Sequence, residues 1–187
     1  MAIYRQMGQI LRRIHTIRFA KCGEISGGEL IAAGTNADYM RGMFAQQLQD
    51  FDALGGPADL GDPMRRFVAQ HDPALTTSQG GVLCHNDYVD GNIHVTETSH
   101  GWQVSGVVDV ERAVVADPLL DVARSTRSKS AWFAAFGAGY GVRVGVDDEL
   151  LALYDLYHVL ELWDWFAKRN WAEQLPDLER DIARRVT

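Results

Sequence analysis

Apolar residues recur three and four positions apart over most of the chain, which is the spacing of one helix face. Ile3, Met7, Ile10 and Ile14 set this pattern near the N-terminus. Glycines and polar residues interrupt it over 19–34, which predicts a loop. A second helix is expected to begin at Asn36 as its cap, and a shorter one near Asp62-Pro63. The predicted helices span 1–18, 36–53, 61–71, 118–126, 130–138, 147–168 and 171–186.

The middle of the chain follows the pattern of strands instead. Apolar and β-branched residues fill 81–84, 92–96 and 102–109, and a Ser99-His100-Gly101 break predicts a hairpin between the last two. Gly137, Gly139 and Gly141 do not form a dinucleotide-binding fingerprint, and we interpret them as a helix C-terminus. These elements predict one α+β domain over 1–187 that is mainly helical, with a small central β-hairpin.

Composition narrows the class of protein. The 187 residues carry a net charge of −7, which disfavours sequence-independent binding to nucleic acid. Two distant cysteines, Cys22 and Cys84, indicate neither a disulfide scaffold nor a cysteine-rich zinc site. They favour a reducing compartment, and no apolar run is long enough to span a membrane. We therefore expect a cytoplasmic globular protein.

A polar segment between two predicted strands carries the candidate chemistry. It places His85, Asp87 and Asn92 in the pattern H-x-D-x-x-x-x-N, and Asp109 follows an apolar strand 17 residues after Asn92. A hairpin would return Asp109 to the side of Asn92. Their amide and carboxylate oxygens suit Mg²⁺. In kinases such an Asp orients the acceptor hydroxyl and takes its proton, and a later Asp binds metal.

Three segments resemble the aminoglycoside phosphotransferase family of the protein-kinase-like superfamily. HNDYVDGNIHV is similar to its HGDLHPGNVLV-type loop, GVVDVERAVVADPLLDVA to its GVIDWGDAGVGDPALDLA-type segment, and ILRRIH to its LLARLH helix. The resemblance implies Asp87 as catalytic base, Asn92 and Asp109 as Mg²⁺ ligands, and His85 as a support of the loop. It implies that Asp121 ties this loop to a helix through backbone contacts.

The resemblance also implies a C-terminal lobe alone. The family's N-terminal lobe grips ATP with a glycine-rich strand turn and a lysine, and neither pattern precedes residue 85. Only seven residues separate Asp109 from Asp117, too few for the activation segment with which protein kinases recognise peptides. We therefore expect an ATP-dependent phosphotransferase that acts on a small-molecule hydroxyl, such as an antibiotic or metabolite. A catalytically silent binding module is the main alternative, and a metal-dependent hydrolase is a weaker one.

Further residues are weaker candidates. Strand alternation would turn His94 away from Ile93 and Val95 towards the adenine site, if it does not turn to solvent. Val108 would lie on the same apolar floor, and an exposed floor of Val82, Ile93, Val95 and Val108 predicts self-association. Six acidic residues of the late helices would either bind the substrate or lie on solvated helix faces: Asp147, Asp148, Glu149, Asp155, Glu161 and Asp164. His15, His71, His100, Trp163, Trp165 and Trp171 are interpreted as surface or packing residues.

Overall fold

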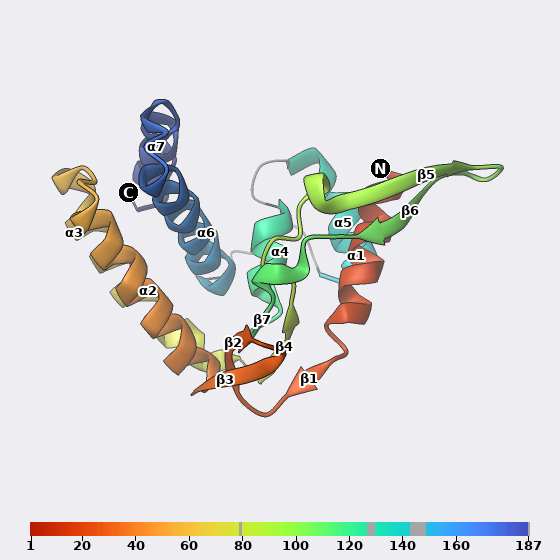
Figure 1. Cartoon of the computed structure of the whole chain (residues 1–187), viewed down its shortest axis with the longest axis horizontal. Helices are drawn as coiled ribbons and strands as arrows, with labels where there is room; N and C mark the ends of the chain where they lie inside the picture. The colour runs from red at the N-terminus through yellow and green to blue at the C-terminus, as the bar shows by residue number, and fades with distance from the viewer. Residues whose placement is uncertain (79, 127–129, 143–148, 187) are drawn as a thin grey trace.

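The computed structural model describes residues 1–78, 80–126, 130–142 and 149–186. Figure 1 shows a small curled sheet with helices on two sides, and a long hairpin that projects from the molecule. The helices are α1 (Ala2–Ile14), α2 (Asn36–Ala53), α3 (Ala58–His71), α4 (Leu119–Thr126), α5 (Ser130–Tyr140), α6 (Glu149–Lys168) and α7 (Leu175–Val186). Short 3-10 turns are η1 (Asp72–Thr77), η2 (Asp90–Asn92), η3 (Val110–Arg112) and η4 (Ala172–Gln174). Within the described residues, no helix is both long and apolar enough to cross a membrane.

Five antiparallel strands form the sheet, in the order β1-β4-β7-β2-β3. They are β1 (Arg18–Phe19), β2 (Cys22–Ser26), β3 (Glu29–Gly34), β4 (Gly81–Cys84) and β7 (Val114–Ala116). The central pair, β4 and β7, is largely buried, and Leu83 lies opposite Val115. The sheet matters for the site because β4 leads directly into residues 85–92, and β7 leads into α4.

The loop predicted over 19–34 is wrong, because β2 and β3 form a hairpin there. Ser26 pairs with Glu29 across a two-residue turn, in which Gly27 and Gly28 have φ of +59° and +84°. Positive φ at both central positions is the conformation that matches the twist of a tight hairpin, and glycine adopts it without strain. The Gly-Gly pair is therefore the turn of a hairpin rather than the middle of a loop.

The second hairpin, β5 (Ile93–Thr98) and β6 (Gly101–Val107), is confirmed. Its register shifts between His94 and Val95. Ile93 is buried, but Val95 is 43% exposed, and His94 is exposed as well. The expected alternation of His94 against a buried Ile93 and Val95 is therefore wrong, because a bulge allows consecutive side chains to lie on one face. The expected exposed floor is reduced to Val95 and Val108, since Val82 and Ile93 are buried.

Two hydrophobic clusters hold the helices. The larger joins α2, α6 and α7 beside the sheet, with Phe51 packed against Trp163. The smaller joins α1 and α5 to the start of β5. A Cβ on Gly8 of α1 would lie 2.2 Å from the Phe136 carbonyl oxygen of α5, so only glycine permits this close approach. In Figure 1 the two groups lie on opposite sides of the sheet.

Several helix boundaries differ from the prediction. α1 ends at Ile14, before the predicted end at residue 18, and the chain then enters the sheet region, where the Leu83 N–H donates to the Ile17 carbonyl. α2 is capped by Thr35, which forms a capping box with Asp38, and not by Asn36. α3 begins at Ala58, four residues before the predicted start, with Pro63 inside it. The helix end predicted at the Gly137–Gly141 segment is confirmed, because Gly141 has φ +99° directly after α5.

Candidate active site

Residues 85–92 form a loop whose first residues are hydrogen-bonded to the buried carboxylate of Asp121. Asp121 lies in α4 and is 0% exposed. Its two oxygens accept hydrogen bonds of 2.7 Å from the backbone N–H groups of His85 and Asn86. Hydrogen bonds to a charged acceptor are the strong kind, so this contact fixes the start of the loop. It is the backbone contact that the sequence motif implied.

Sequence reasoning missed the third partner of Asp121. His15, at the end of α1, is 6% exposed, and its Nε2 lies 3.1 Å from the Asp121 Oδ2. A carboxylate can only accept, so Nε2 carries the proton, and Nδ1 faces the Tyr140 hydroxyl at 2.6 Å. His15 ends the segment ILRRIH, whose resemblance to a family helix was the available signal.

His15, Cys84 and Asp121 lie close enough together to hold a metal ion, but their bonding opposes it. Burial raises the pKa of the Cys84 thiol, which points at the carbonyls of Ala116 and Asp117. Both oxygens of Asp121 are already occupied by backbone donors. The cluster is therefore a hydrogen-bonded anchor of the loop.

His85 connects the loop to the end of β6. It is 3% exposed, its Nδ1 accepts from the Asp87 backbone N–H at 3.3 Å, and its Nε2 lies 3.0 Å from the Val108 carbonyl. A carbonyl only accepts, so Nε2 carries the proton and the ring is in one defined tautomer. His85 thus joins the backbone of Asp87 to the residue that precedes Asp109, as a support of the loop would.

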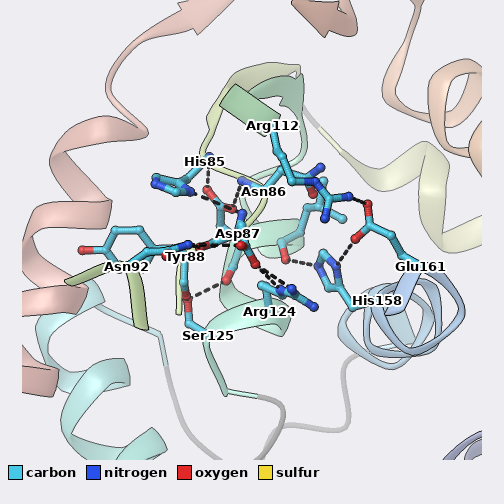
Figure 2. A network of polar contacts seen from close by, with 12 residues as sticks. His85, Asn86, Asp87, Tyr88, Asn92, Arg112, Arg124, Ser125, His158 and Glu161 are labelled. Atoms are coloured by element: carbon cyan, nitrogen blue, oxygen red, sulfur yellow. Dashed lines mark hydrogen bonds and ion pairs between the residues drawn. The ribbon is translucent and has the colours of Figure 1, made fainter. Parts of the chain in front are cut away.

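Asp87 is half-buried at the centre of the network in Figure 2. Its Oδ1 accepts hydrogen bonds from Arg124, with Nε at 3.0 Å, and its Oδ2 accepts one of 3.1 Å from the Asn92 amide. Burial by itself would raise the pKa of Asp87, but the bonds from Arg124 and Asn92 outweigh it, and the pKa is lowered. Asp87 is therefore an oriented carboxylate at neutral pH.

Arg124 is a site residue that the sequence analysis did not identify. It stands in the last turn of α4, 37 residues beyond Asp87, and only 12% of its side chain is exposed. The hydroxyl of Ser125 beside it lies 2.9 Å from the Tyr88 carbonyl and 2.8 Å from the Asp121 carbonyl, which share its one proton. Helix α4 therefore holds the loop through three side chains: the carboxylate of Asp121, the guanidinium of Arg124 and the hydroxyl of Ser125.

Asn92 and Asp109 meet where the hairpin closes. The Val108 N–H donates to the Asn92 carbonyl at 3.1 Å, and Ile93 lies opposite Val107, so Asp109 directly follows the residue that is hydrogen-bonded to Asn92. Asp109 is exposed and has a left-handed backbone, with φ of +66°. The Asn92 side-chain nitrogen donates hydrogen bonds to Asp87. The side-chain oxygen of Asn92 therefore has no partner among the described residues. Two free oxygens of this kind fit Mg²⁺.

A cavity of about 220 Å³ opens beside the loop and is bordered by acidic and aromatic side chains. Glu161 borders it; its Oε1 accepts a hydrogen bond from Arg112, and its Oε2 lies 3.5 Å from the His158 Nδ1. Burial would raise the pKa of Glu161, but His158 and Arg112 outweigh it and the pKa is lowered. The buried Oδ1 of Asn86 has no hydrogen-bond partner among the described residues. The lining residues are Glu24, Ile25, Tyr39, Met43, Asn86, Glu111, Arg112, Ala113, Val114, Tyr157 and Glu161.

The other acidic candidates lie elsewhere. Asp155 pairs with Arg185 of α7 at 2.7 Å, and Asp164 pairs with Lys168 at 2.9 Å. Neither lines the cavity, so Glu161 is the only one of these acids within the described residues that does. Glu149 is exposed at the start of α6, and Asp147 and Asp148 lie outside the described residues. Of the tryptophans, Trp163 is buried, and Trp171 is 47% exposed but packs edge-on against Trp165, with ring centroids 5.1 Å apart.

A loop with this Asp and Asn, followed by a hairpin and a second Asp, defines a kinase-like phosphotransferase site. The chain belongs to the phosphotransferase enzyme family, whose model matches residues 2–163. An aminoglycoside 3'-phosphotransferase from Streptomyces fradiae is 29% identical over 168 residues, which cover 83% of this chain and 58% of the relative.

Solved structures share the fold. An aminoglycoside phosphotransferase in a ternary complex with AMP-PNP and hygromycin B aligns over 99% of this chain and 64% of its own, with a TM-score of 0.73 and 14% identity. The choline kinase LicA of Streptococcus pneumoniae aligns over 98% of this chain and 62% of its own, with a TM-score of 0.62 and 15% identity. The chain thus spans about three fifths of the length of these relatives.

Proposed function

We propose that this chain carries the catalytic loop and metal ligands of an enzyme that transfers the terminal phosphoryl group of ATP to the hydroxyl of a small molecule. The observation that carries the proposal is the convergence of Asp87, Asn92 and Asp109 at the base of one hairpin. Family membership supports the reaction class. The AMP-PNP complex of a structural relative is consistent with ATP as donor.

The residues of the chain would divide the work as follows. Asp87 accepts the proton of the acceptor hydroxyl and orients its oxygen, while Arg124 and Asn92 hold the carboxylate in place. Asn92 and Asp109 hold Mg²⁺ through oxygen atoms. When bound, that ion neutralises phosphate charge during transfer. Asp121 and His85 keep the loop in register with the hairpin.

His94 and Val108 remain proposed contacts of the nucleotide base. Both are exposed near the base of the β5–β6 hairpin, away from its turn, and Val108 directly precedes Asp109. The register of the hairpin shifts directly after His94, and the side chains of His94 and Val95 are both exposed. A His94→Leu variant is therefore expected to change nucleotide affinity more than the matched His100→Leu variant at the hairpin tip does.

The cavity beside Asn86 is proposed as the acceptor site. Glu24 and Glu111, which line the cavity, have no ion-pair partner among the described residues. The Oδ1 of Asn86 is an unsatisfied acceptor, so a ligand with a hydrogen-bond donor would satisfy it. Tyr39 and Tyr157 add aromatic surface, on which cations bind favourably. These features favour an acceptor that carries an ammonium group near its hydroxyl.

The catalytic role is tested with Asp87→Asn and, as matched control, Asp90→Asn. Asp90 lies three residues away, is exposed, and contacts the Tyr4 hydroxyl, which an Asn can still do. We expect Asp87→Asn to lower kcat by about 100-fold or more, as the loss of a general base does. Asp90→Asn should keep the wild-type rate. Near-native turnover of Asp87→Asn would reject the proposed mechanism.

The metal role is tested by calorimetry, which needs no acceptor. Asp109→Asn removes a charged oxygen ligand and should weaken Mg²⁺-nucleotide binding more than metal-free nucleotide binding. Equal losses under both conditions would reject Asp109 as a ligand.

The acceptor site is tested with Glu24→Gln. It should raise KM for amine-bearing alcohols and leave KM for neutral polyols unchanged, whereas an equal effect on both would reject the cation site.

A further inference from the structure

A second and larger cavity lies away from the catalytic loop. Its volume is about 510 Å³, within the range of small-molecule sites, and it forms where the end of α1, strand β1, the start of β4 and the end of α5 meet. None of its lining residues belongs to the loop 85–92 or to the acceptor cavity. In Figure 1, β1 lies at the lower edge of the molecule, whereas the β5–β6 hairpin projects at the upper right. The lining residues are Arg12, His15, Thr16, Arg18, Gly80, Val82, Asp117, Pro118 and Tyr140.

Two arginines give this cavity its chemistry. Arg12 and Arg18 are exposed at its rim and make no ion pair or side-chain hydrogen bond with any described residue. Other arginines of this acidic chain, such as Arg41 and Arg185, lie against carboxylates. Arg12 and Arg18 therefore place two guanidinium groups on one concavity of a protein whose net charge is −7. Each carries a positive charge that attracts oxyanions.

The other polar groups of the wall are already satisfied. The Tyr140 hydroxyl is engaged by His15, and the Thr16 hydroxyl donates to the Arg13 carbonyl. Asp117, the acidic member of the wall, is 5% exposed and accepts a hydrogen bond from the Leu119 N–H. The free donors are therefore the two guanidinium forks, whose planar geometry matches the oxygens of phosphate.

We propose that this cavity is a binding site for a phosphorylated small molecule, whose phosphate is held by Arg12 and Arg18. The site is separate from the catalytic one, and its ligand can be present whether or not the proposed transfer reaction takes place. The volume allows a molecule larger than phosphate itself, with its uncharged part against Val82, Pro118 and the Tyr140 ring.

The experiment uses inorganic pyrophosphate as the probe, titrated calorimetrically into the full chain at low salt with a chelator and no divalent metal. We expect saturable binding with a Kd of about 1 mM or tighter. Arg12→Gln and Arg18→Gln should each weaken it about tenfold, since each removes a charge-assisted contact. The matched control is Arg13→Gln, which changes the neighbouring exposed arginine outside the cavity and should leave the Kd unchanged.

One further variant separates this site from the catalytic one. Arg124→Gln removes the guanidinium at Asp87 and should leave pyrophosphate binding intact. Loss of binding in Arg124→Gln with retention in Arg12→Gln would overturn the proposal, because the anion would then bind at the catalytic loop. Absence of binding at millimolar pyrophosphate, or equal weakening by Arg13→Gln, would overturn it too. Because all variants change exposed or partly exposed side chains, thermal unfolding followed by circular dichroism verifies that each is folded.

Discussion

Replacement of Asp121 by Asn is expected to destabilise the whole protein, because this carboxylate anchors the loop from inside. Its oxygens each accept a 2.7 Å hydrogen bond from a backbone N–H, one from His85 and one from Asn86. An Asn keeps one acceptor oxygen and presents an NH₂ group to the second N–H. One charge-assisted bond is lost, worth about 1.5–3 kcal/mol, and a fully buried N–H loses its partner.

The net loss in the free energy of unfolding should be about 3 kcal/mol. For a chain of this length that corresponds to a fall in Tm of roughly 9 °C. Urea unfolding followed by circular dichroism measures it directly. The control is Asp59→Asn, which changes an exposed carboxylate in the first turn of α3 and should cost less than about 1 kcal/mol.

The two variants must differ for the reasoning to hold. If Asp121→Asn lies within about 0.5 kcal/mol of wild type, the backbone contacts contribute little and the anchor described above is wrong. If it is destabilised but hydrogen exchange at His85 and Asn86 remains as protected as in wild type, the loss arises elsewhere in α4.

Three further outcomes follow from particular contacts. Arg124→Leu should lower the free energy of unfolding by about 2 kcal/mol, because it leaves the half-buried Asp87 carboxylate unpaired. In urea unfolding, the double variant with Asp87→Asn should recover part of that loss. Additive losses would contradict a coupled pair. The lowered pKa of Glu161 means that its contribution to stability is present above its ordinary pKa of 4.5 and is lost as pH falls below it. Between about pH 5 and pH 3, the Glu161→Gln variant should therefore lose less stability than wild type, and parallel curves would refute this. Gly8→Ala should cost about 1–2 kcal/mol through collision with α5, whereas Gly42→Ala, whose Cβ would meet nothing within 4 Å, should gain about 0.5 kcal/mol; shifts of the same sign in Tm would count against the close packing.

The loop and hairpin could be predicted from the sequence because their information is local. Asp87 and Asn92 lie five residues apart, and the break at Ser99–Gly101 sets the turn that returns the chain to Asp109. Strand pairing then follows from the two apolar runs. The helices α2, α5 and α6 were predicted for the same reason, since apolar spacing on one face reports burial whatever covers it.

Local patterns gave a wrong prediction where one sequence pattern is compatible with two structures. Gly27-Gly28 reads as a chain break or as a hairpin turn, and only the pairing of β2 with β7 decides for the turn. The orientation of His94 depends on a bulge that alternation cannot foresee.

Contacts between distant segments were decided by the tertiary structure alone. Arg124 reaches Asp87 across 37 residues, and His15 reaches Asp121 across 106. The sequence around an arginine or histidine does not indicate its partner. For His15 and Arg124, the partner depends on how α1 and α4 pack against β4. The sequence by itself determined which side chains could do the chemistry, and the packing decided which cation orients the carboxylate and which arginines remain unpaired.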